Sequence, residues 1–339
     1  MLFRKSFAIS IFSFVMLIML SLLSSCERDL SLDSFRDRNT EDMLVVNAIL
    51  NPDSVMKVSV THPFFFSVPH TYYPPVDGLE VMMSSDVNDW QSLEFDPASG
   101  LYVSDRRPTA GTPIRLRITG KNHEVSAIDT VPHEVIIEKV EVSGEGPIHI
   151  YWDDDYRFTY RITFQDPPEE ENFYFLSVES DALSYEFSQM GQVDYSLDYV
   201  FNVLAEMINK DMQGWRPDGV FGYPFSDKGI DGKRYTLTIT EVVQSPMTQM
   251  IERLPRRINL YSISRPYFEY MLSILSQDYD QVALKGNLLS LGLIEPTKIY
   301  TNIESGAGLL GCYTLNRIKI DLLKYTGGWP SSKSSNYRK

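Results

Sequence analysis

The chain has 339 residues, with 31 basic and 45 acidic side chains and a net charge of −14 at pH 7. Nucleic acids bind to basic surfaces through their phosphates, so this balance argues against a nucleic-acid partner. The chain is long enough for more than one hydrophobic core, and its two cysteines are too few for a disulfide scaffold.

The N-terminal segment has the pattern of a secretory signal. Two basic residues precede an apolar stretch, 7–23, that holds only hydroxyl side chains besides apolar ones. The sequence Leu-Ser-Ser-Cys at 23–26 is typical of a bacterial lipobox, which predicts that residues 1–25 are removed and that Cys26 is acylated. The acyl chains on Cys26 would include palmitate. An uncleaved membrane anchor is the alternative, because about 20 apolar residues can span a bilayer.

Acylation of Cys26 has two consequences for the mature chain. Each buried CH₂ contributes about 0.8 kcal/mol, so several acyl chains on Cys26 would hold the protein firmly at a membrane. Cys312 would then be the remaining cysteine, and its apolar surroundings predict a buried small hydrophobe.

Removing residues 1–25 takes away two basic residues and changes the net charge from −14 to −16. Residues 26–42 are polar and predict a tether.

Short strand-like segments separated by turn residues fill residues 43–132. Turn signals such as Asp77-Gly78 and Ser99-Gly100 separate them. This texture is typical of a β-sandwich, so we predict an immunoglobulin-like unit over 43–132. The predicted strands include 44–50, 56–61, 79–82 and 114–118.

A second β-rich unit is predicted over 133–325, followed by a flexible tail at 326–339. Residues 156–164 alternate, which places Phe158, Tyr160, Ile162 and Phe164 on one buried face. Helical spacing predicts two short insertions, near 197–210 and 265–276, with Ser264 as the cap of the second. The chain is therefore predicted to be mainly β.

Two short motifs point away from cofactors. Residues 306–311 match the G-x-G-x-x-G fingerprint of dinucleotide sites, but the strand-like residues 313–322 follow where a helix is required. We predict instead a bulged loop whose glycines allow positive φ or close backbone approach. Residues 227–232 lack the ligand set of a calcium loop and predict a turn. No cofactor or metal site is predicted.

The segment 64–75 has the most unusual composition in the chain. It contains five aromatic residues and three prolines in twelve positions. Rigid aromatic side chains give contact surface at low entropy cost, so Phe65, Phe66, Tyr72 and Tyr73 are candidates for a ligand or partner contact. The alternative is that they fold back onto the core.

Several segments, in order, resemble the family called domain of unknown function 4249, which occurs among outer-membrane lipoproteins of Bacteroidota-type bacteria. The resemblance implies no catalytic residues. It implies an accessory role, because such proteins are often encoded near TonB-dependent transporters. The segments that carry it are 43–50, 128–132, 164–167, 172–174, 225–233, 260–270 and 302–311.

Together these features predict a non-enzymatic binding or accessory module anchored in the outer membrane through Cys26. It would face either the cell surface or the periplasm and would be the partner of a TonB-dependent transporter in nutrient uptake. Two alternatives stay open. One is a surface hydrolase that uses paired carboxylates, and the other is a structural or adhesion protein of the envelope.

Overall fold

The computed structural model describes residues 43–63, 74–85, 89–120, 124–148, 155–180, 191–201, 222–243, 255–282 and 298–325. Strands dominate these residues, so the prediction of a mainly β protein is confirmed. The strands are β1 (Val45–Leu50), β2 (Lys57–Thr61), β3 (Glu80–Ser84), β4 (Trp90–Asp96), β5 (Leu101–Val103), β6 (Pro113–Thr119), β7 (Glu124–Thr130), β8 (Ile137–Ile148), β9 (Asp155–Gln165), β10 (Phe173–Ser180), β11 (Gly191–Asp194), β12 (Gly222–Ser226), β13 (Arg234–Val243), β14 (Arg256–Ile263) and β15 (Ala307–Ile320). The helices that lie wholly within the described residues are α6 (Arg265–Val282) and the 3-10 helix η2 (Leu322–Tyr325).

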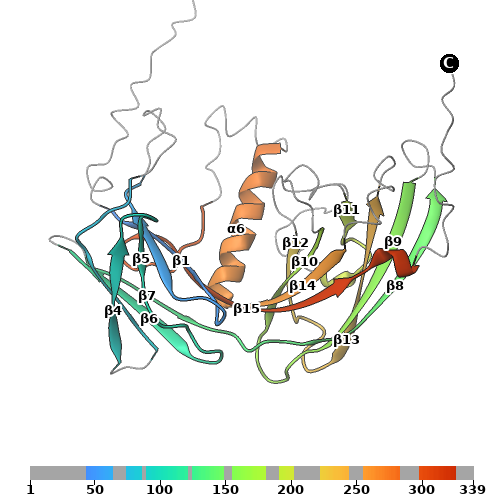
Figure 1. Ribbon diagram of the computed structural model, residues 1–339, viewed down its shortest axis with the longest axis horizontal. Helices are drawn as coiled ribbons and strands as arrows, with labels where there is room; N and C mark the ends of the chain where they lie inside the picture. The colour runs from blue at the N-terminus through green and yellow to red at the C-terminus, as the bar shows by residue number, and fades with distance from the viewer. Residues whose placement is uncertain are drawn as a thin grey trace, which may run out of the picture.

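One long strand, β15, joins the two halves of the molecule (Figure 1). The larger sheet has eleven strands in the order β12-β10-β14-β15-β1-β2-β5-β4-β3-β6-β7. Residues 307–312 of β15 pair in parallel with β1, and residues 313–320 pair antiparallel with β14. The last strand of the chain therefore belongs to both halves. This strand order is compatible with the predicted immunoglobulin-like sandwich.

Residues just before β15 close the N-terminal half. Ser126 of β7 and Glu304 exchange two backbone hydrogen bonds, of 3.4 and 2.8 Å. The core of this half, which is built from β1 to β7, also takes in Ile303, Leu310 and Cys312. Cys312 is buried and forms no disulfide, as predicted. The N-terminal core is thus completed by residues from the other end of the chain.

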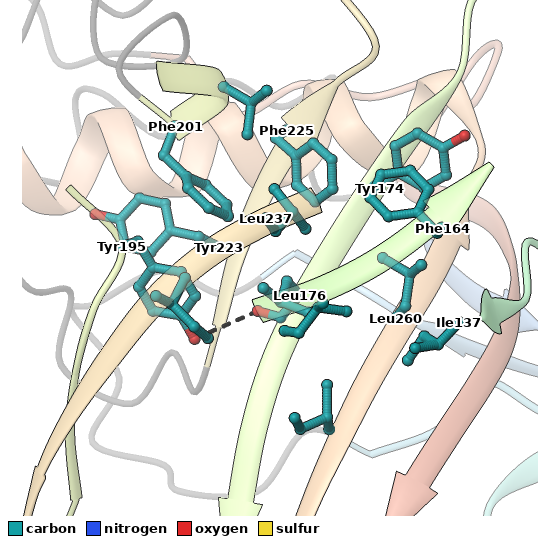
Figure 2. Packing of buried hydrophobic residues seen from close by; sticks show 14 of the residues in the cluster. Ile137, Phe164, Tyr174, Leu176, Tyr195, Phe201, Tyr223, Phe225, Leu237 and Leu260 are labelled. Atoms are coloured by element: carbon teal, nitrogen blue, oxygen red, sulfur yellow. Dashed lines mark hydrogen bonds between the residues drawn. The ribbon is translucent and has the colours of Figure 1, made fainter. Parts of the chain in front are cut away.

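Aromatic side chains fill the core between the two sheets of the C-terminal half (Figure 2). The smaller sheet has the order β11-β13-β9-β8. Ring centroids of Phe164 in β9 and Tyr174 in β10 are 5.4 Å apart, and Phe225 of β12 lies 5.1 Å from Tyr174. Such pairs add about 0.5–1.5 kcal/mol each beyond the burial of their area. These contacts fix the two sheets against each other.

Helix α6 packs on the larger sheet beside β15, β10 and β12 (Figure 1). Phe268, Leu272 and Leu275 recur every three to four residues and are buried, so one stripe of the helix faces the sheet. The Ser264 carbonyl accepts the Phe268 amide at 2.9 Å, while the Ser264 hydroxyl accepts the amide of Cys312 at 3.1 Å. No helix among the described residues is long and apolar enough to cross a membrane.

Of the other predicted helix, 197–210, only residues 197–201 are described, and 199–201 are helical. The predicted signal at 1–25, the tether at 26–42 and the tail at 326–339 lie outside the described residues.

A glycine in β15 allows the close pairing with β1. Gly308 has a φ of +108°, and a Cβ there would lie 2.0 Å from the Val46 carbonyl oxygen. The predicted need for glycine is thus met inside a strand, not in a bulged loop.

Substituting Gly308→Ala is therefore expected to lower the free energy of unfolding by about 2–3 kcal/mol, measured by urea denaturation. Gly78→Ala is the control, because Gly78 has a φ of +71° but nothing within 4 Å of its Cβ position. Its loss should be limited to backbone strain of about 1 kcal/mol. Equal losses in the two variants would contradict a role for Gly308 in strand contact.

Candidate ligand-binding site

Three aromatic side chains form a row on the face of the larger sheet that is turned away from the smaller sheet. Tyr174 of β10 contacts the core between the sheets, so its neighbour Phe175 points the other way. The ring of Phe175 lies 5.6 Å from that of Tyr261 in β14, and Tyr261 lies 5.6 Å from Tyr313 in β15. Both contacts are edge-on, with interplanar angles of 65° and 61°. We call these three rings the aromatic floor.

Helix α6 and the aromatic floor together line a pocket of about 500 Å³. Phe173 and Phe268, with ring centroids 4.6 Å apart, pack the start of the helix on the same strand β10. The volume is in the range of small-molecule sites in proteins. The lining residues are mainly aromatic and aliphatic: Ile49, Phe175, Ser177, Glu179, Pro224, Tyr261, Ile263, Tyr267, Tyr270, Met271, Ile274, Leu275 and Tyr313.

The polar side chains at one end of the pocket are bonded to one another. Asn259 donates to the Ser177 hydroxyl at 2.9 Å, and that hydroxyl donates to Glu179 at 3.2 Å. Arg317 donates to the side-chain oxygen Oδ1 of Asn259 at 2.6 Å. The Glu179 carboxylate also lies 3.5 Å from the guanidinium of Arg257, with both side chains 29% exposed. The one acid among the lining residues that the structure describes therefore has a counter-charge.

Three tyrosines of the pocket, Tyr261, Tyr267 and Tyr313, remain protonated at neutral pH. Burial raises the pKa of Tyr267 to about 12, and the neighbouring Tyr313, Tyr261 and Tyr270 act in the same direction. Burial also raises the pKa values of Tyr261 and Tyr313. The hydroxyl of Tyr313 accepts a hydrogen bond of 3.0 Å from Asn51. Glu179 is therefore the one charged side chain among the described lining residues. Arg257 pairs with it, and Arg317, outside the lining, is bonded to Asn259.

A second polar group surrounds the turn before β13. Carboxylate oxygens of Asp166, Asp227 and Asp231 lie within 4.8 Å of one another, and oxygen ligands suit a hard cation such as Ca²⁺. However, both oxygens of Asp166 already accept hydrogen bonds, from the Tyr174 hydroxyl at 2.5 Å and the Gly232 amide at 2.8 Å. Burial, with repulsion from Asp227 and Asp231, raises the pKa of Asp166. We therefore interpret these carboxylates as a structural group whose hydrogen bonds stabilise the predicted turn.

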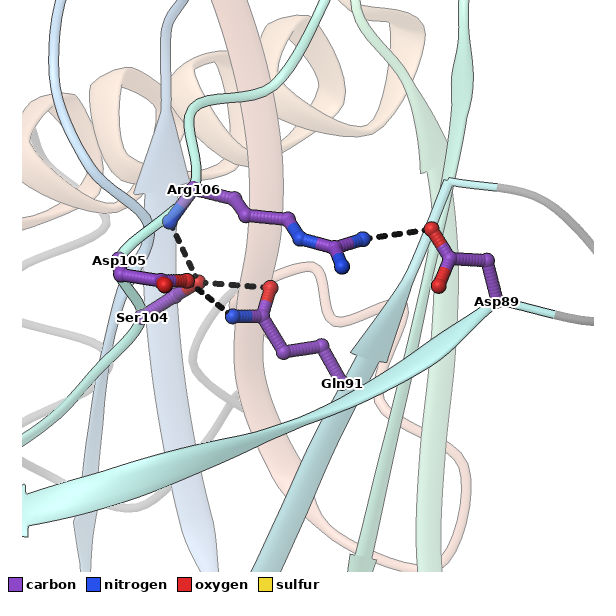
Figure 3. Close-up of polar contacts among 5 residues, drawn as sticks. All are labelled: Asp89, Gln91, Ser104, Asp105 and Arg106. Carbon is purple, nitrogen blue, oxygen red and sulfur yellow. Dashed lines mark hydrogen bonds and ion pairs between the residues drawn. The ribbon is translucent and has the colours of Figure 1, made fainter.

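A third polar group lies at the surface of the N-terminal half (Figure 3). Arg106 and Asp89 pair at 2.5 Å, but their side chains are 54% and 55% exposed. Ser104 donates to Gln91 at 3.0 Å, and Gln91 contacts Asp105. Exposed pairs contribute about 0–1 kcal/mol to stability. We therefore interpret this network as a surface link between β4 and the segment after β5, and not as a binding site.

The residues predicted from sequence as sites lie outside the described part of the chain. They are Cys26, Phe65, Phe66, Tyr72 and Tyr73. The pocket was not predicted. The signal that could have indicated it is the set of aromatic residues in 261–270. Their pattern predicts a strand and a helix, but it does not show that these residues line one pocket.

Fold and site define a mainly β protein in which a helix and a sheet face line an aromatic pocket. The model of the family described as Domain of unknown function (DUF4249) matches residues 29–318, and the chain belongs to this family. The matched range includes every described residue that lines the pocket. The comparison with curated proteins finds no match.

Proposed function

We propose that this protein is a lipid-anchored, non-enzymatic binding module of the outer membrane that holds a ligand in the pocket beside α6. It acts as the partner of a TonB-dependent transporter in nutrient uptake. The observation that carries the proposal is the pocket itself. It is concave, about 500 Å³ in volume and lined mainly by apolar and aromatic side chains, which is the usual composition of small-molecule sites.

The alternative of a carboxylate hydrolase finds less support. Such an enzyme needs two acids that flank the substrate. Among the described lining residues Glu179 is the one acid, and it is paired with Arg257. Asp166 and Asp227 are buried with raised pKa values, but they lie at the turn before β13 and do not line the pocket. A purely structural or adhesive protein has no need of the pocket.

The N-terminal segment supports the anchor and the location. The Leu-Ser-Ser-Cys sequence at 23–26 directs acylation to Cys26, and the polar residues 27–41 give the folded part reach from the membrane. Several acyl chains hold a protein stably at a bilayer without a spanning helix. The aromatic residues of 64–75 supply a second contact surface, which we assign to the transporter.

Affinity purification from native membranes tests the proposal. The intact chain should co-purify with a TonB-dependent transporter and fractionate with the outer membrane. Cys26→Ala should move the protein into the soluble fraction, because it removes the acyl chains. A double variant, Tyr72→Ala with Tyr73→Ala, should stay in the membrane and lose the transporter.

Two results would contradict the proposal. Retention of the Cys26→Ala protein in the membrane would exclude the lipid anchor. Purification of the native protein without any transporter would exclude the accessory role. Unfolding of the Tyr72/Tyr73 double variant would instead show that these rings belong to the core.

A further inference from the structure

We infer that the pocket beside α6 selects a neutral, mainly apolar small molecule and discriminates against anions. The inference rests on the proposed function, because it takes this pocket as the ligand site. Three properties of the lining carry it: apolar walls, polar groups that are already satisfied, and the sign of the charges around them.

The walls favour an apolar ligand. The aromatic floor of Phe175, Tyr261 and Tyr313 faces Met271 and Ile274 of α6, so a ligand between them contacts rings on one side and flexible aliphatic chains on the other. Burial of apolar ligand surface there is favourable at about 25 cal/mol per Å². A strongly polar ligand would lose its hydration without matching partners in most of the pocket.

The polar end offers few free partners. Ser177 accepts from Asn259 and donates to Glu179, and Arg317 is bonded to Asn259. A ligand gains little from these groups unless it breaks a bond that exists. One hydroxyl or carbonyl on the ligand would pair with a tyrosine hydroxyl of the lining.

The charges disfavour an anion. Among the described lining residues there is no lysine, arginine or histidine, and the one charged side chain is the carboxylate of Glu179. An anion would meet this carboxylate, and both nearby guanidinium groups are already engaged: Arg257 lies 3.5 Å from Glu179, and Arg317 donates to Asn259 at 2.6 Å. The net charge of −14 adds long-range repulsion. A cation would gain little, because Arg257 already neutralises Glu179.

Two fluorescent probes with the same skeleton test the inference on the full-length protein. N-phenyl-1-naphthylamine is neutral and apolar, and 8-anilinonaphthalene-1-sulfonate is the same molecule with a sulfonate. The neutral probe should bind at least about tenfold more tightly, a difference of about 1.4 kcal/mol. Both titrations are followed by the rise in probe emission.

Variants on α6 then place the bound probe. Ile274→Trp fills the pocket and should weaken binding of the neutral probe at least about tenfold. Glu269→Trp is the matched control, because it adds the same bulk on α6 at a residue outside the lining. It should leave binding unchanged.

Glu179→Gln tests the charge argument separately. This change removes the one negative charge among the described lining residues, so the anionic probe should bind more tightly while the neutral probe is unaffected. The side chain is partly exposed, so the variant keeps the test valid if Ile274→Trp does not fold.

The outcomes separate the two proposals. Binding that is lost in Ile274→Trp but favours the anionic probe would overturn the selection of neutral ligands and keep the pocket as a ligand site. An unchanged anionic affinity in Glu179→Gln would also overturn the charge argument. Failure of both probes to bind, or binding of the neutral probe that Ile274→Trp leaves intact, would overturn the pocket as the ligand site and the proposed function with it.

Discussion

Substituting Arg256→Ala is expected to lower the free energy of unfolding by about 3–5 kcal/mol, because it leaves the Glu241 carboxylate buried without its counter-charge. Arg256 in β14 and Glu241 in β13 are 4% and 2% exposed, with a guanidinium–carboxylate distance of 2.9 Å. Tyr160 donates to the same carboxylate at 2.5 Å. Burial opposes the charge of Arg256, but Glu241 outweighs it and raises the pKa of Arg256. The measurement is urea denaturation at neutral pH.

A triple variant separates charge from packing. Arg256→Met, Glu241→Met and Tyr160→Phe together keep an apolar volume between the two sheets and leave no polar atom of the three without a partner. Its stability should lie within about 1–2 kcal/mol of the natural chain, since apolar replacements of buried ion pairs are often neutral. A loss as large as that of Arg256→Ala would show that packing, not the unpaired charge, is responsible.

Substituting Asp129→Asn is expected to stabilise the protein at pH 8 by up to about 3 kcal/mol. Asp129 is 6% exposed at the end of β7, and its buried Oδ2 atom has no hydrogen-bond partner among the described residues. Burial raises the pKa of Asp129 to about 6 from a usual 3.8, although Ser264, the Thr130 amide and Cys312 act in the opposite direction. Ionising this group in the folded protein is therefore unfavourable.

The sign of the pH dependence follows from the raised pKa. The folded state holds the proton more tightly than the unfolded state, so the contribution of Asp129 is fully present below about pH 4 and is lost as pH rises through about 6. The Asp129→Asn variant should match the natural chain at pH 4 and exceed it at pH 8, as measured by urea denaturation across this window.

Asp96 provides a control of opposite sign. Hydrogen bonds from the Ser99 hydroxyl and the Ala98 amide lower the pKa of Asp96. Its contribution is present above its usual pKa and is lost as the pH falls, so Asp96→Asn should reduce stability at pH 8 and leave it unchanged at low pH. A pH profile of the Asp129→Asn variant parallel to that of the natural chain would contradict the assignment.

Local patterns predicted the strands well because each depends on near neighbours. Alternation over 156–164 placed Phe158, Tyr160, Ile162 and Phe164 on one buried face, and all four are fully buried in β9. The fold class followed from such segments. The parallel pairing of β1 with β15 was not predictable, because the alternation of apolar residues in a strand does not indicate which strand lies beside it.

The candidate site was less predictable than the fold. The turn at 227–232 was predicted, but the arrival of Asp166 beside it depends on the register of β9 against β13. The pocket likewise needs Phe175, Tyr261 and Tyr313 to lie on neighbouring strands, and α6 to cover them. A single sequence gives the residue types and leaves these tertiary distances open.

The shared strand β15 makes the two ends of the chain depend on each other. Asn51 and Tyr313, which are hydrogen-bonded, stand 262 positions apart, and β1 pairs in parallel with residues 307–312. Pairing over such separations is slow and leaves strand edges open in the meantime. During synthesis β1 therefore cannot pair with β15 until the C-terminal part of the chain has been made. Loss of the residues after about 306, by early termination or proteolysis, would therefore open the N-terminal half as well as the C-terminal one.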